Sequence, residues 1–129
     1  MAYVDIVTAL ALLQFMVFGF KVAKARGRYG IAAPAIAGNE IFERYFRVQQ
    51  NTLEQLIVFL PALYVFSHYF SPLVAAALGV VYLIGREIYA VTYVKDPKKR
   101  ELGYALSVLP PAILIFGGLF GAIRQLAGH

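Results

Sequence analysis

Polar residues recur at intervals of three and four where the chain otherwise becomes apolar. They are Arg44, Arg47, Asn51 and Glu54. This spacing places their side chains on one face of an α-helix. An arginine can grip a carboxylate through two parallel hydrogen bonds, and a glutamate can receive an ammonium group. The apolar run 56–66 follows directly, and an ionisable group at membrane depth costs about 2.5–3.5 kcal/mol. The pattern therefore predicts a polar site at a membrane edge.

A second polar stripe lies further along the chain. It consists of Tyr82, Arg86, Tyr89 and Tyr93, which are spaced four, three and four residues apart. Such residues again share one helical face. Glu87 points about 100° away from Arg86 and must serve a different neighbour.

Both stripes also allow structural interpretations. Arg47 and Glu54 can form an ion pair that fixes helix packing without any ligand. Tyr89 and Tyr93 can be ordinary interfacial aromatics, which membrane helices favour. Arg86 either contacts a ligand or holds helices together by pairing with Glu54 or a backbone carbonyl, and we favour the second role.

The composition is that of a membrane protein. The chain has 129 residues, 60% of them hydrophobic and 15% charged, with a mean hydropathy of +0.68. Soluble domains contain about 45–50% apolar residues. The net charge of +5 comes from basic residues clustered between apolar segments. Membrane lipid and topology explain that clustering better than nucleic acid does.

The absence of cysteine narrows the chemistry. The chain has no disulfide framework, thiol nucleophile or thiolate metal site, so thiol chemistry must come from a bound molecule. The sequence also contains no cluster with metal-ligand spacing. No signal-peptide pattern precedes the first apolar segment, which we expect to be retained.

The length suits a single membrane domain, residues 1–129, with four apolar segments. They predict transmembrane helices over about 3–22, 43–68, 73–94 and 97–123. Each approaches the roughly 20 residues that a span requires. Short connections predict an all-α, antiparallel four-helix bundle. The glycines of the last two segments predict close helix approach; they are Gly79, Gly85, Gly117, Gly118 and Gly121.

The loops predict the orientation of an integral, multi-pass protein. Lysine and arginine are concentrated in loops 21–41 and 94–100. These two loops are expected to face the cytoplasm, with both termini on the opposite side. Asp96 and Pro97 are typical of an N-cap and a first helical position. They predict that the fourth helix starts there, with Arg100 in its first turn.

The two stripes together resemble the MAPEG family, the membrane-associated proteins of eicosanoid and glutathione metabolism. Its second-helix pattern, E-R-x-x-R-x-Q-x-N-x-x-E, is matched by Glu43, Arg44, Arg47, Gln49, Asn51 and Glu54. Its second pattern, an arginine, two tyrosines and a basic residue at the start of the fourth helix, is matched by Arg86, Tyr89, Tyr93 and Arg100. The resemblance covers nearly the whole chain.

The resemblance implies a homotrimer that binds glutathione as a co-substrate between subunits. It implies a glutathione transferase acting in detoxification on lipophilic electrophiles, with peroxidase activity towards lipid hydroperoxides as a further expectation. The residues implied to bind glutathione are Arg26, Arg47, Gln49, Asn51, Glu54, Tyr89 and Tyr93. Arg100 is implied as the catalytic residue that activates the thiol.

Two positions carry particular expectations. Gln49 lies on the opposite side of the helix from Arg47, so it either packs structurally or serves the site of another subunit. Gln55 stands where some family members have a tyrosine that contacts glutathione.

The sequence also allows two other functions: a non-catalytic lipid-presenting protein of the same fold, and a small transporter subunit. Arg100 and the two tyrosines favour catalysis.

Overall fold

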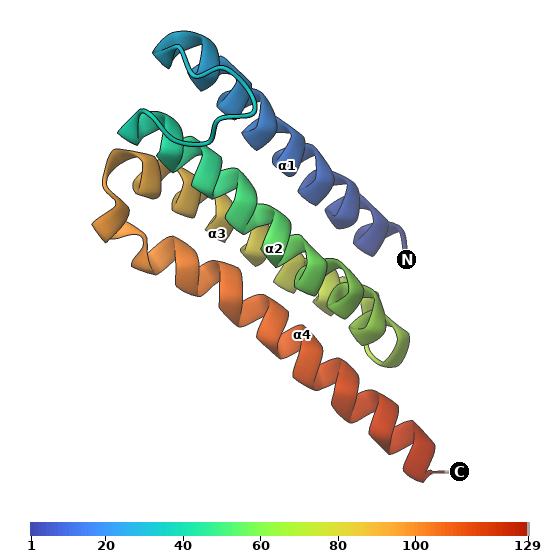
Figure 1. The fold of residues 1–129 in the computed structure, drawn as a ribbon. Coiled ribbons are helices and arrows are strands. Elements are labelled where there is room, and N and C mark those ends of the chain that lie inside the picture. Colours follow the sequence, from blue (N-terminus) through green and yellow to red (C-terminus); the bar gives the residue numbers. More distant parts are fainter. Residues whose placement is uncertain (129) are drawn as a thin grey trace.

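The computed structural model of the protein describes residues 1–128 as four long helices and one short 3-10 turn. The elements are α1 (Ala2–Tyr29), α2 (Glu40–Tyr69), α3 (Pro72–Lys95), η1 (Pro97–Lys99) and α4 (Glu101–Ala127). His129 lies outside the described residues. Successive helices run in opposite directions and lie side by side (Figure 1). The predicted all-helical class is confirmed.

Local side-chain bonds explain where the helices begin. The Asn39 side chain accepts hydrogen bonds from the backbone N–H groups of Ile41 and Phe42, at 2.9 and 3.0 Å, and so caps α2. Ser71 caps α3 in the same way by accepting from Val74 at 3.4 Å. At the other end of α1, Gly30 adopts a left-handed conformation with φ 68°, which ends that helix.

The fourth helix begins later than predicted. Asp96 does cap a helical turn, with its side chain accepting from the Lys98 N–H at 3.1 Å. That turn is η1, in which the Lys99 N–H bonds to the Asp96 carbonyl, three residues back. Chain reversal between α3 and α4 uses this tight turn. Arg100 therefore stands at the N-cap of α4 and not within its first turn.

Three helices, α1, α3 and α4, are long and apolar enough to cross a membrane. Helix α2 is the longest of the four, but its first half carries the polar block that begins at Glu40. The fourth predicted span, along α2, therefore stays a prediction.

Helices α2 and α3 form the middle of the molecule, because α1 and α4 each pack against both of them. The main core includes Phe59 and Tyr82, whose rings stack with centroids 3.9 Å apart. A second cluster, which we call the Phe18 cluster, lies towards the end of the bundle that holds the α3–α4 connection. It contains Phe18, Val48, Tyr89 and Ala90.

Two glycines bring α3 and α4 into close contact. A Cβ atom added to Gly85 would lie 2.7 Å from the Leu106 carbonyl carbon, and one added to Gly103 would overlap the backbone of Tyr89. Small residues are common where membrane helices approach closely. The close approach predicted at Gly85 is therefore confirmed, whereas Gly103 was not predicted. Gly103 sets the distance between Tyr89 and the start of α4.

Candidate functional site

A cavity of about 450 Å³ opens where α2, α3 and α4 meet near the α3–α4 connection. Its lining consists of Arg47, Asn51, Tyr89, Tyr93, Arg100, Glu101 and Tyr104. We call it the polar cavity. The structure thus brings five of the sequence-predicted site residues together from three helices. Glu101 and Tyr104 are additions that the sequence patterns did not single out.

Helix α2 contributes a cation and an amide. The Arg47 Nη1 and Glu54 Oε1 atoms are 3.9 Å apart, and the two side chains are 55% and 62% exposed. A pair this loose and this exposed leaves both groups available for a ligand. Asn51 Oδ1 is buried and has no hydrogen-bond partner within residues 1–128. Glu54 lies beside the cavity through its contact with Arg47 and is not part of its lining.

Helix α3 contributes two stacked tyrosines held from beneath by an arginine. The rings of Tyr89 and Tyr93 have centroids 5.3 Å apart and are nearly parallel. The Arg86 guanidinium lies 4.5 Å from the Tyr89 ring centroid, which is a favourable cation–π arrangement. Both tyrosines line the polar cavity.

Arg86 itself has a structural role. Its side chain is fully buried, and Nη2 donates to Thr52 Oγ1 at 2.6 Å. The predicted pairing with Glu54 or a carbonyl is wrong: Thr52 is buried and faces α3, whereas Glu54 is exposed. Arg86 Nε and Nη1 have no partner in the described part of the chain. Arg86 therefore joins α2 to α3 below the polar cavity.

Helix α4 contributes the end of a helix and its flanking charges. Arg100 is exposed, and its carbonyl accepts the N–H of Tyr104 at 2.9 Å. The first backbone N–H groups of a helix carry partial positive charge that favours a nearby anion. Arg100 and Arg47 add two full positive charges, and Glu101 adds one negative charge. The lining is therefore positive on balance, which favours an anionic ligand beside Arg47 and Arg100.

Two predicted binding residues lie elsewhere within the single chain. Arg26 Nη1 donates to the carbonyls of Ala35 and Ile31, at 2.6 and 3.5 Å, and the guanidinium lies over the Phe42 ring. Arg26 thus fastens the connection between α1 and α2. The Gln49 amide packs against Gly19 of α1, 3.1 Å from where a Cβ would stand. Neither residue lines the polar cavity.

Arg44 also serves the fold, although it shares the predicted stripe. It donates from Nη1 to the carbonyls of Val94 and Lys95, at 2.9 and 3.3 Å. Its Nη2 pairs with Glu40 at 2.8 Å. Arg44 therefore satisfies the last carbonyls of α3 and ties them to α2. Among residues 1–128, no group of acidic residues and histidines could hold a metal ion.

Comparison with known proteins decides the family. The model of the MAPEG family matches residues 4–120. The chain belongs to the MAPEG family. With three helices able to cross a membrane, this MAPEG chain is a membrane protein.

Several known proteins are similar along most of the chain. An uncharacterized protein of Synechocystis is 47% identical over 121 residues, which cover 94% of this chain and 88% of that protein. Human microsomal glutathione S-transferase 2 is 38% identical, covering 89% and 78%. Leukotriene C4 synthase of Cavia porcellus is 35% identical over 94 residues, covering 73% and 63%. These similarities confirm the resemblance that the two polar stripes predicted.

Proposed function

We propose that this MAPEG protein is a membrane glutathione transferase that conjugates glutathione to lipophilic electrophiles. The observation that carries the proposal is the convergence of Arg47, Asn51, Tyr93 and Arg100 on one cavity. Relatives named glutathione S-transferase and leukotriene C4 synthase support it. The chain has no thiol of its own, so the reacting sulfur comes from the co-substrate.

The charges of the cavity suit glutathione, which has two carboxylates, one ammonium group and one thiol. Arg47 can grip a carboxylate through its guanidinium. Asn51 offers an amide whose buried oxygen lacks a partner within residues 1–128. Glu54, loosely paired with Arg47, receives the ammonium group. The stacked Tyr89 and Tyr93 rings bound the cavity on the α3 side.

Arg100 is the catalytic residue of this proposal. A free thiol has a pKa of about 8.5, and a nearby cation or helix N-terminus lowers it. Arg100 at the N-cap of α4 supplies both. The thiol proton passes to water. The sulfur then forms a bond to the electrophilic carbon, from which the leaving group departs with its electron pair. With a lipid hydroperoxide, two glutathione molecules would instead give the alcohol, water and glutathione disulfide.

The positions of Arg26 and Gln49 support a homotrimer with shared sites. Both lie on the α1 side of α2, away from the polar cavity of their own subunit. A neighbouring subunit whose α1–α2 side faced this cavity would add them to the bound glutathione. The same side carries an apolar groove of about 800 Å³ that a neighbour would cover; Leu12, Phe15, Met16, Leu53, Ile57 and Pro61 are among its lining residues. Mass measurement in mild detergent tests the trimer, and a stable, active monomer would contradict it.

The connections 30–39 and 96–100 lie at the same end of the molecule as the polar cavity (Figure 1). We place that end in the cytoplasm, where the cavity would open towards soluble glutathione.

Conjugation of glutathione to a chlorinated nitrobenzene by the purified protein tests the function. The expected result is release of chloride and formation of the thioether. If glutathione binds but no conjugate forms with this or any lipid-derived electrophile, the protein instead presents lipids, as the alternative function requires. If glutathione does not bind at all, the assignment of the polar cavity is wrong.

A further inference from the structure

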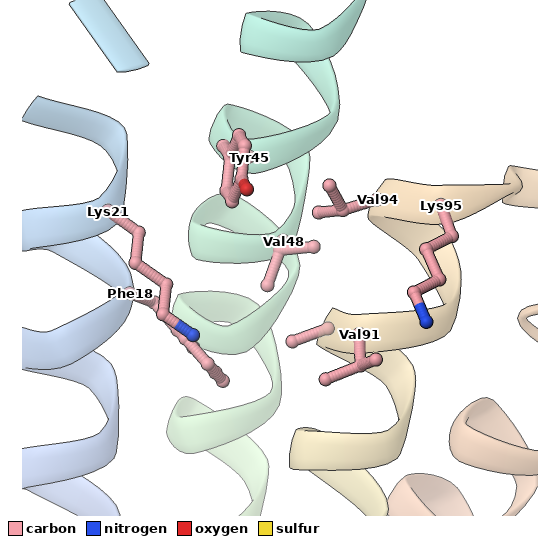
Figure 2. A pocket seen from close by; sticks show the side chains of 8 residues that line it. Phe18, Lys21, Tyr45, Val48, Val91, Val94 and Lys95 are labelled. Atoms are coloured by element: carbon pink, nitrogen blue, oxygen red, sulfur yellow. The ribbon is translucent and has the colours of Figure 1, made fainter. Parts of the chain in front are cut away.

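A second cavity lies at the same end of the molecule, between α1, α2 and α3. Its volume is about 210 Å³. Its lining consists of Phe18, Lys21, Tyr45, Val48, Ala90, Val91, Val94 and Lys95 (Figure 2). The interior is apolar, and Figure 2 shows Lys21 on one wall and Lys95 on the other, with Val48, Val91 and Val94 between them. We call it the lysine cavity.

Lys21 and Lys95 have no anionic partner among residues 1–128. The two ion pairs found among residues 1–128 use Arg44 and Arg47. Lys21 and Lys95 therefore carry uncompensated charge beside an apolar hollow. An adjoining hollow of about 180 Å³ shares Lys21 and Tyr45 and adds Lys24 and Arg28. The local positive charge thus exceeds what either lysine supplies alone.

The apolar surface continues from the lysine cavity along the α1–α3 side. One turn further along both helices lies a hollow of about 400 Å³, and its lining includes Leu10, Leu13, Val17, Leu83, Ile84 and Ile88. Glu87 interrupts this surface, and its Oε1 accepts a hydrogen bond from Gln14 Nε2 at 3.2 Å. From Lys21 to Leu10 the rise of the helix is about 16 Å. One leaflet of a bilayer has a hydrocarbon depth of about 15 Å.

We propose that the α1–α3 groove, formed by the lysine cavity and its apolar continuation, holds an anionic membrane lipid. The headgroup phosphate lies between Lys21 and Lys95, with the Tyr45 hydroxyl as a further donor. One acyl chain follows Val94 and Val91 towards Leu10. Lysines at a membrane boundary ordinarily act as diffuse topology anchors. These two differ because they flank an apolar cavity that, together with its continuation to Leu10, has about the length of one leaflet. The inference depends on insertion in a membrane and not on the thiol chemistry.

The test is retention of lipid by the purified full-length protein, measured by native mass spectrometry. The protein is exchanged into mild detergent with equal amounts of phosphatidylglycerol and phosphatidylcholine that carry the same acyl chains. The wild type is expected to retain phosphatidylglycerol preferentially. The double substitution Lys21→Gln/Lys95→Gln is expected to lower that retention about tenfold or more.

Matched variants distinguish a specific lipid site from non-specific electrostatic attraction. Lys98→Gln/Lys99→Gln removes the same charge from η1, whose lysines are exposed and do not line the cavity; retention should stay within about twofold of wild type. Val91→Trp keeps every charge but fills the groove from a half-exposed position, and it should abolish the preference.

Four results would overturn the proposal. If both double lysine variants lose phosphatidylglycerol retention equally, the attraction is diffuse, and if Val91→Trp retains the lipid as the wild type does, no acyl chain lies in the groove. If millimolar inorganic phosphate displaces the lipid, the cavity is a site for a free anion. Equal retention of both lipids by the wild type would show that the groove does not select an anionic headgroup.

Discussion

The polar cavity and the lysine cavity lie on opposite sides of the same two helices, and adjacent residues supply them. Arg47 lines the polar cavity and Val48 the lysine cavity. On α3, Tyr93 and Val94 are divided in the same way. Successive residues of a helix point about 100° apart, so each helix serves two environments within one turn. The Phe18 cluster, which includes Val48, lies between the two cavities.

The two cavities also differ in the cations they use. The polar cavity has Arg47 and Arg100, whose planar guanidinium groups match a carboxylate bidentately. The lysine cavity has Lys21 and Lys95, compact charges on flexible stems that can follow a mobile phosphate. The difference indicates a fixed, oriented ligand on the α4 side and an adaptable one on the α1 side.

The largest expected effect is on catalysis at the polar cavity. Arg100→Ala should lower turnover about 10²–10³-fold, as removal of one donor to a developing anion commonly does. Affinity for glutathione should change far less, because the interaction grows as the sulfur gains charge. Steady-state kinetics and the thiolate absorbance of bound glutathione measure the two effects.

Variants near Arg100 supply the controls for that measurement. Arg100→Lys should recover only part of the activity, since an ammonium does not reproduce the guanidinium geometry. Lys98→Ala should remain close to wild type because Lys98 does not line the cavity. If Arg100→Ala keeps wild-type turnover, the thiol is activated instead by Tyr93 or by the N-terminal end of α4.

The next largest effect is expected on glutathione binding, and it tests whether the polar cavity and the lysine cavity are separate sites. Arg47→Ala should weaken glutathione by about 2 kcal/mol, the lower end of the range for losing one partner of a charged contact, because Arg47 is more than half exposed. Val91→Ala should leave that affinity unchanged, since Val91 is half-exposed and lines the lysine cavity. Calorimetry compares them, and equal losses would mean that the cavities are not separate sites.

A smaller effect is expected on stability, at the contact that lies beneath the polar cavity. Thr52→Val leaves the buried Arg86 Nη2 without its 2.6 Å acceptor, which should cost about 1–2 kcal/mol. Thr52→Ser keeps the hydroxyl and loses only a buried methyl group, so it should cost less than Thr52→Val, about 0.8 kcal/mol. Thermal unfolding in one detergent compares the three proteins. Unchanged stability in Thr52→Val would show that Arg86 does not depend on this bond.

Much of the polar cavity could be predicted because periodicity relates residues within one helix. The stripes Arg47–Asn51 and Tyr89–Tyr93 each follow from helical spacing, and the family resemblance supplied the relation between helices. Glu101 and Tyr104 were missed because the sequence predicted that the fourth helix begins at Pro97. The 3-10 turn η1 lies there instead, so the faces of the first α4 residues could not be assigned.

Contacts between helices were the part that the sequence could not supply. The bond from Arg86 to Thr52 joins residues 34 positions apart, and no pattern within either helix selects that partner. Gly103 is likewise explained only by the Tyr89 backbone opposite it. From the sequence, Lys95 was interpreted as part of the basic loop that sets membrane topology. Its position across an apolar cavity from Lys21 depends on the packing of α1 against α3, which no pattern within either helix predicts.

The smallest effects are expected at two carboxylates near the polar cavity, and they should have opposite signs. Glu54→Gln should weaken glutathione by about 0.5–1 kcal/mol, as expected for an exposed charge pair, because its carboxylate receives the ammonium group. It should not weaken an analogue of glutathione that lacks the amino group. Glu101→Gln should instead strengthen both ligands slightly, since it removes negative charge beside Arg100 at the start of α4. Calorimetry with the two ligands measures all four values. If Glu101→Gln weakens glutathione but not the analogue, the ammonium group lies at α4, and the ligand is oriented opposite to our proposal.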